Sequence, residues 1–190
     1  HGSSVTDGIG LMGGAIQGRE LSLSTAVTTF AGTGSECSSN CDNTTGTLAS
    51  FKRPYGITTD GTNLYVTDNG KNTIRKIVIS SGAVTTLAGT GSSGSSDNAI
   101  GTSASFDNFN GITTDGANLY VAELGNHQIR KIVIDNGTVT TLAGTGSACS
   151  SNCDNATGTS ARFKNPGGIT TDGTNLYVTD RGINKIRKIE

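Results

Sequence analysis

The sequence contains no tryptophan, only two prolines, and little charge of either sign. Charged residues make up 15% of the 190 residues, and the formal net charge at pH 7 is −1. A chain so close to neutral has no broad electrostatic field that would draw it onto nucleic acid or anionic lipid. No apolar run approaches the length that a membrane-spanning helix requires. We therefore expect neither nucleic-acid binding nor membrane insertion.

Glycine, by contrast, is abundant, with 28 residues, and threonine and serine are also frequent. High glycine with little proline indicates many short strands joined by tight turns rather than disorder. Nothing in the chain has the 3.6-residue period of an amphipathic helix, which excludes a helical solenoid. The composition therefore favours an all-β fold.

Three phrases recur almost verbatim along the chain. GITTDGTNLYVTD, or a close variant, occupies residues 56–68, 111–123 and 168–180. IRKI follows each copy and begins at Ile74, Ile129 and Ile186, at spacings of 55 and 57 residues. VTTFA or VTTLA begins at Val27, Val84 and Val139. Such periods indicate a repeat architecture in which each repeat is one structural unit.

Each repeat divides into four expected strands. In the first repeat these are GITT, NLYVT, IRKIVI and VTTLAG, with the hairpin dipeptide Asp60-Gly61 after the first. Leu64 and Val66 point to one side of the second strand and Tyr65 to the other. A small four-stranded sheet cannot bury both faces alone, but copies stacked radially can. The repeats therefore predict a β-propeller with three four-stranded blades.

The second repeat contains the motif Asn126-His127-Gln128-Ile129-Arg130-Lys131-Ile132, which resembles the signature of NHL repeats. A Leu-Tyr-Val strand and an acidic residue precede it, as is usual in that family. In each repeat, the segment that precedes the innermost strand also resembles that of the family. These segments are residues 51–56, 106–111 and 163–168. The resemblance covers residues 25–190 and implies an NHL-type propeller. It implies little about function, because the family includes scaffolds, ligand binders and a few enzymes.

The signature positions Asn126, His127, Ile129 and Arg130 are not all repeated. Where the second repeat has Asn-His, the first repeat has Lys71-Asn72 and the third has Ile183-Asn184. This departure favours His127 as a turn residue rather than a reactive group.

Two acidic positions recur in every repeat. The first precedes glycine in the hairpin, where an Asp-Gly turn explains it better than a ring of carboxylates around a cation; these residues are Asp60, Asp115 and Asp172. The other acidic position lies at the end of the second strand. We expect its carboxylate to bind backbone amides of the next turn or to pair with the arginine of IRKI. A calcium site is the alternative. These residues are Asp68, Glu123 and Asp180, and the arginines are Arg75, Arg130 and Arg187.

We expect the arginine stems to pack between blades while their charged heads reach solvent. A nucleic-acid-binding face built on these arginines would need a broad basic surface with exposed aromatics, and the chain has neither.

No catalytic motif stands out. His127 is the only internal histidine, so no cluster of histidines can hold a metal, and neither a nucleophile elbow nor a phosphate-binding loop is present. We expect no catalytic residue, cofactor or metal site. The alternative is a metal-dependent lyase or lactonase of the propeller type, with a calcium ion on Glu, Asn and Asp side chains in the central channel.

The four cysteines form two pairs with the same spacing, Cys37 with Cys41 and Cys149 with Cys153. Two such pairs could hold zinc, but they lie about 110 residues apart and lack the usual Cys-x-x-Cys knuckle. Two local disulfides are the better interpretation and imply an oxidising compartment. We expect the protein to be extracellular or on the cell surface, with the periplasm as a further option.

Three blades are fewer than the roughly four to eight of closed propellers. The last repeat has no fourth-strand phrase, whereas Val27, Thr28, Thr29, Phe30 and Ala31 form one with no blade in front of it. We expect residues 26–32 to complete the last blade of the same or a partner chain. A six-bladed homodimer is the favoured assembly and an open filament the alternative. Residues 1–25 are interpreted as an extension outside the repeats, either a tag remnant, a linker or a donor segment.

The sequence therefore predicts an exported, non-enzymatic module for interaction or self-assembly. A filament or surface-layer subunit would fit this class. The long loops after each fourth strand offer a surface for an unidentified protein or glycan ligand.

Overall fold

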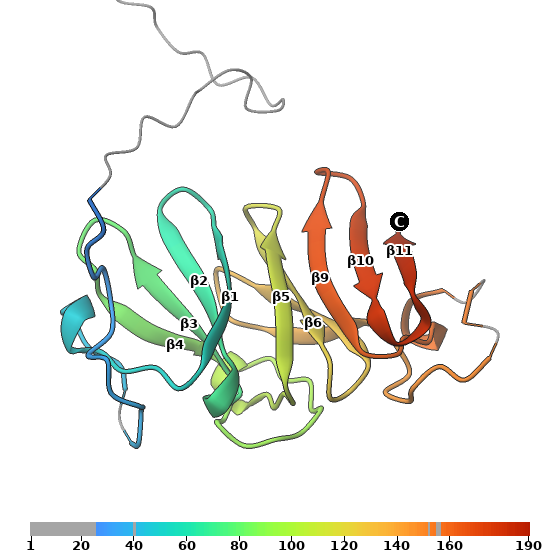
Figure 1. Cartoon of the computed structure of the whole chain (residues 1–190), viewed down its shortest axis with the longest axis horizontal. Helices are drawn as coiled ribbons and strands as arrows, with labels where there is room; N and C mark the ends of the chain where they lie inside the picture. The colour runs from blue at the N-terminus through green and yellow to red at the C-terminus, as the bar shows by residue number, and fades with distance from the viewer. Residues whose placement is uncertain (1–25, 40, 152, 155–156) are drawn as a thin grey trace, which may run out of the picture.

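The computed structural model describes residues 26–39, 41–151, 153–154 and 157–190. Within these residues the chain forms three antiparallel sheets that stand side by side in a row (Figure 1). The first blade comprises β1 (Pro54–Thr59), β2 (Asn63–Asp68), β3 (Thr73–Val78) and β4 (Val84–Ala88). The second comprises β5 (Phe109–Thr114), β6 (Asn118–Glu123), β7 (Gln128–Val133) and β8 (Val139–Ala143). The third comprises β9 (Pro166–Thr171), β10 (Leu176–Asp180) and β11 (Lys185–Ile189).

Helical structure among the described residues is confined to short 3-10 turns. They are η1 (Gly46–Leu48), η2 (Asn69–Lys71), η3 (Gly101–Ser103), η4 (Gly158–Ser160) and η5 (Arg181–Ile183). Within the same residues no helix is long and apolar enough to span a bilayer. The predicted all-β propeller blades are confirmed, and completion of a half-propeller by a second chain stays a prediction.

The strands follow the predicted phrases with one systematic difference. Each innermost strand begins two residues before its Gly-Ile-Thr-Thr phrase, because a register shift lets the strand continue past a bulge. In the first blade that shift lies between Pro54 and Ile57, after which Ile57 pairs with Val66. The Asp-Gly hairpins then turn the chain through a glycine with positive φ, such as Gly116 at +92°.

The core lies between blades rather than within them. One face of the first blade, including Tyr65 and Ile74, packs against the opposite face of the second, including Phe106, Leu119 and Ile132. The second and third blades meet in the same way through a separate cluster. Val66 packs on the far side of the first blade from Tyr65, so the predicted alternation of faces along β2 is met. Stacking therefore buries both faces of the middle blade.

The third blade has three strands in the single chain. Residues 26–32, which were expected to supply a fourth strand, form no strand here. The predicted extension 1–25 lies outside the described residues.

Candidate functional site

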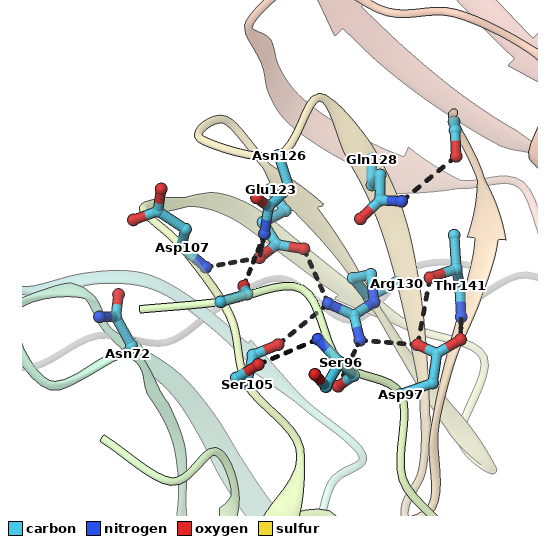
Figure 2. Close-up of polar contacts among 12 residues, drawn as sticks. Asn72, Ser96, Asp97, Ser105, Asp107, Glu123, Asn126, Gln128, Arg130 and Thr141 are labelled. Carbon is cyan, nitrogen blue, oxygen red and sulfur yellow. Dashed lines mark hydrogen bonds and ion pairs between the residues drawn. The ribbon is translucent and has the colours of Figure 1, made fainter. Parts of the chain in front are cut away.

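An arginine at the same position of the third strand organises each blade, and it is buried in the first two blades. In the second blade, Arg130 donates to Glu123 Oε2 at 2.9 Å through Nη1 and to Asp97 Oδ1 at 2.7 Å through Nη2. The same nitrogens donate to the backbone carbonyls of Ser105 and Ser96, at 3.2 and 3.1 Å (Figure 2). One guanidinium therefore joins β7 to the end of β6 and to two points of the loop between β4 and β5.

The carboxylate of Glu123 is fully buried at the end of β6. It accepts hydrogen bonds from the backbone N–H of Asp107 and from the side-chain amide of Asn126. Burial raises the pKa of Glu123, against the opposing effects of Arg130 and these hydrogen bonds. The same contacts recur in the other blades, where Asp68 binds Arg75 and the Lys52 N–H, and Asp180 binds Arg187 and the Lys164 N–H. The predicted pairing of the strand-end carboxylates with arginine is confirmed, but the backbone amides that they bind lie before the innermost strand of the blade and not in the next turn.

The expected exposure of the arginine heads is wrong. The side chains of Arg75 and Arg130 are 1% and 0% exposed. Their guanidinium carbons lie 5.1 Å from the centroid of the Phe51 ring and 5.0 Å from that of the Phe106 ring, respectively. A planar cation is accommodated here because carboxylates and carbonyls pair with its edge while the aromatic ring covers its face.

In the first two blades, the aspartate of the long loop also binds the fourth strand. Asp97 accepts hydrogen bonds from the Thr141 N–H at 2.9 Å and from the Thr141 hydroxyl at 3.1 Å. In the first blade Asp42 accepts the same two bonds from Thr86, both at 3.0 Å. We call each aspartate–arginine–threonine unit a strand latch; the two latches are Asp42–Arg75–Thr86 and Asp97–Arg130–Thr141.

The latch aspartates are not among the site residues that the sequence predicts. A usable signal was present, because Asp42, Asp97 and Asp154 stand at the same place in each long loop. Their partners lie more than thirty positions away in the sequence, for example 33 from Asp97 to Arg130, so spacing alone did not connect them.

The third blade arranges the corresponding residues differently. Asp154 is 53% exposed and binds Lys185 Nζ at 2.5 Å and Arg187 Nε at 3.5 Å. Arg187 keeps its bond to Asp180 at 3.2 Å, and its side chain is 12% exposed. The contact between Asp154 and Arg187 is therefore longer than the 2.7 Å contacts of the first two blades and is made through Nε rather than Nη2.

A cavity of about 280 Å³ lies beside β11. Its lining residues are Ala143, Thr157, Gly158, Ala161, Phe163, Arg187, Lys188, Ile189 and Glu190. The candidate functional site is the set of arginine-centred contacts in the three blades, together with the loops that these contacts hold.

Both predicted disulfides are present, joining Cys37 to Cys41 and Cys149 to Cys153. The carbonyl oxygen of Cys41 accepts a hydrogen bond from Arg75 at 3.0 Å. In the second blade, where the loop has no disulfide, the carbonyl oxygen of Ser96 accepts the corresponding hydrogen bond from Arg130. Each bridge therefore closes a turn that presents a carbonyl and the following aspartate to the buried arginine.

We expect thiol titration of the unfolded, unreduced protein to find no free thiol. All four cysteines are paired in disulfides, and no free cysteine is found among the described residues. A reagent such as Ellman's in denaturant gives the count. Four reactive thiols per chain would contradict the disulfides and the argument for export.

The hairpin aspartates are turn residues in the structure. Asp115 accepts hydrogen bonds from the N–H groups of Ala117 and Asn118 and from the Tyr120 hydroxyl. Burial acts to raise the pKa of Asp115, but the bonds from Asn118, Ala117 and Tyr120 outweigh it and lower the pKa to about 2. Burial and the bond to Asp115 also raise the pKa of Tyr120 to about 12.

A depressed folded pKa makes the stabilising effect of Asp115 depend on pH. Because the unfolded carboxyl titrates near pH 4, the contribution is complete above that value and is lost as the pH falls toward about 2. We expect Asp115→Ala to lower the free energy of unfolding by about 1 kcal/mol at neutral pH, allowing for solvent screening, and by much less near pH 2. Urea unfolding at both pH values measures this, with the exposed Asp135→Ala as control. An equal loss at both pH values would contradict the role of the ionised carboxylate.

His127 has backbone φ of +52°, and Asn72 and Asn184 have the same left-handed conformation at +48° and +55°. Asparagine adopts this conformation more readily than most residues, which explains why it replaces histidine in the other repeats. His127 Nδ1 accepts a hydrogen bond from the Asn165 N–H at 3.2 Å, which links the second blade to the third. Its role is structural, as the sequence suggested.

Within the described residues no three His, Cys, Asp or Glu side chains are grouped to hold a metal. We expect a chelator to leave the melting temperature unchanged, because the repeated carboxylates are occupied by arginines and backbone amides. Calorimetry with and without EDTA tests this. A fall of many degrees would show that a metal is coupled to folding.

No family model matches the chain. Among curated proteins, NHL repeat-containing protein 2 of Bos taurus is 32% identical over 179 residues, covering 85% of this chain. The Homo sapiens protein of the same name is 31% identical over the same length. The chain spans 24% of each of these relatives.

Solved structures of similar fold include two from Bacteroides thetaiotaomicron. A protein of unknown function has a TM-score of 0.56 and 26% identity, over 66% of this chain and 32% of that one. An auxiliary nutrient binding protein has a TM-score of 0.60 and 23% identity, over 75% of this chain and 38% of that one. The curated relatives, together with the repeated phrases and the blade geometry, show that the chain belongs to the NHL-repeat family of β-propellers.

Proposed function

We propose that the chain is an exported, non-enzymatic β-propeller module for interaction or self-assembly. The observation that carries the proposal is that the repeated carboxylates already bind arginines and backbone amides, as Glu123 does with Arg130 and the Asp107 N–H. These side chains therefore hold the blades and loops together.

The long loops that lead into each blade suit an interaction surface. Each of the two latches ties one point of a loop to its blade, through Asp42 in the first blade and Asp97 in the second. A loop held on a rigid scaffold can present its remaining polar residues to a partner.

Export is supported by the two disulfides, which persist in oxidising compartments. Each holds the turn that carries a latch aspartate, so an oxidising environment also preserves the acceptor geometry. We place the protein outside the cytosol, at the cell surface or in the surrounding medium.

Isothermal titration of the chain with Ca²⁺ and with Zn²⁺ tests the proposal against a metal-dependent lyase or lactonase. We expect no saturable heat from either ion, because the repeated carboxylates are occupied by arginines and backbone amides. The variant Asp135→Ala, which removes an exposed carboxylate, is the matched control for weak surface binding. Saturable binding at micromolar concentration would favour the enzyme and overturn the proposal.

A further inference from the structure

We infer that a cavity beside the disulfide-closed turn of the first blade binds one unit of a neutral saccharide, and that Thr73 is the residue that leaves this cavity open. This inference rests on the proposed function, because it names a ligand class for the same loops.

The cavity has a volume of about 340 Å³ and lies between the first blade and the loop that leads into the second. Its walls come from the turn that the Cys37–Cys41 disulfide closes, from η2, from β4 with the residues that follow it, and from Thr102 of η3. Ligand pockets range upward from about 300 Å³. The space therefore suits a small ligand or one unit of a larger one.

The second blade fills the corresponding space with its own side chain. Gln128 Nε2 donates to the Gly144 carbonyl oxygen at 3.3 Å (Figure 2). The equivalent residues of the first blade are Thr73, which is shorter and has no amide, and Gly89. Both of them line the cavity. The Gly89 carbonyl is therefore left without the side-chain donor that the Gly144 carbonyl has.

A pair of equivalent glycines shows the same difference. A Cβ on Gly146 of the second blade would lie 3.6 Å from Gln128 Nε2 and 3.9 Å from the Asn126 carbonyl oxygen. A Cβ on Gly91 of the first blade would meet only the Lys71 carbonyl oxygen among the described residues, at 3.6 Å. The backbone is thus alike in the two blades, and the glutamine amide is what the first blade lacks. The cavity has the place of a hydrogen-bond donor that the chain itself does not supply.

The charges around the cavity balance. Lys71 and Arg75 are the cations of its wall and Asp42 is the anion, while the buried Asp68 pairs with Arg75 at 3.4 Å from behind the wall. Asp42 is 39% exposed even though it binds Arg75 at 2.7 Å, so its carboxylate can accept further hydrogen bonds. Two cations face two anions, and this balance favours an uncharged ligand.

Hydroxyl groups match these partners because each can donate one hydrogen bond and accept two. A ligand hydroxyl can donate to the Gly89 carbonyl or to Asp42 and accept from Lys71 Nζ. Thr73 and Thr90 add hydroxyls of the protein at the wall. A saccharide ring carries several hydroxyls at fixed spacing, whereas an apolar ligand would leave these polar groups unpaired. The geometry therefore points to a neutral sugar.

NMR titration of the isotope-labelled 190-residue chain tests this assignment. The probes are glucose, galactose, mannose and N-acetylglucosamine, with glucuronate as a charged comparison. We expect at least one neutral sugar to shift the amide signals of Thr73, Gly89 and Gly91 saturably. The dissociation constant should be on the order of 1 mM, as suits a ligand of about a dozen heavy atoms. Binding of glucuronate alone would overturn the neutral ligand, and no saturable shift with any neutral sugar would overturn the site.

Two variants copy the second blade and separate the cavity from other surfaces. Thr73→Gln supplies the side chain that Gln128 places against its glycine; the chain should stay folded by circular dichroism and bind the sugar roughly tenfold more weakly or worse. Lys71→Asn, which copies Asn126, should weaken binding about tenfold through the loss of one charged donor. Thr85→Gln, at an exposed position of β4 outside the cavity, is the matched control. Undiminished binding by folded Thr73→Gln would overturn the inference and leave the proposed function standing, because that function rests on the occupied carboxylates.

Discussion

Replacing Arg130 by leucine is expected to lower the free energy of unfolding by about 3–5 kcal/mol, because it leaves a buried charge without its partner. Glu123 is fully buried and its carboxylate lies 2.9 Å from Arg130 Nη1. The substitution also removes the bonds of the guanidinium to Asp97 and to two loop carbonyls. Urea unfolding followed by circular dichroism measures the loss.

Two companions sharpen this experiment. Lys131→Leu removes a positive charge from the neighbouring, partly exposed position of β7 and should change stability by no more than about 0.5 kcal/mol. The double variant Glu123→Leu/Arg130→Leu should be more stable than Arg130→Leu alone, because it leaves no unpaired buried carboxylate. A loss below 1 kcal/mol for Arg130→Leu, roughly that of an ordinary surface change, would contradict the organising role of the arginine.

Gly144→Ala is expected to destabilise the fold by about 3 kcal/mol, against about 1 kcal/mol for Gly116→Ala. Both glycines have positive φ, +106° and +92°, so both substitutions carry backbone strain. They differ in space, since a Cβ on Gly144 would lie 2.6 Å from the His127 carbonyl oxygen, whereas one on Gly116 would meet nothing within 4 Å. The same unfolding assay compares them. Equal losses would show that strain alone, without the close approach of β8 to the β7 turn, determines the cost.

Much of the fold could be predicted because each repeat contains its own strand and turn signals. The Asp-Gly dipeptide sets the hairpin between the first two strands, and alternation along NLYVT assigns Val66 and Tyr65 to opposite faces. The left-handed turn at His127 could also be inferred, because asparagine replaces it in the other repeats.

The latch could not be predicted in the same way. Arg130 is polar and lies in an alternating strand, which ordinarily indicates a head that reaches solvent. Its burial depends on Asp97, Ser96 and Ser105, which a long loop brings over the blade. That loop has no periodic pattern from which its path could be inferred. Burial of Arg75 and Arg130 is therefore a consequence of tertiary structure that strand periodicity does not contain.

The molar mass of the 190-residue chain in solution tests the proposed self-assembly most directly. The chain mass is 19.3 kDa, and light scattering at micromolar concentration should give twice that value for a closed pair of three-bladed chains. A stable, folded monomer at that concentration would contradict the pairing of two copies.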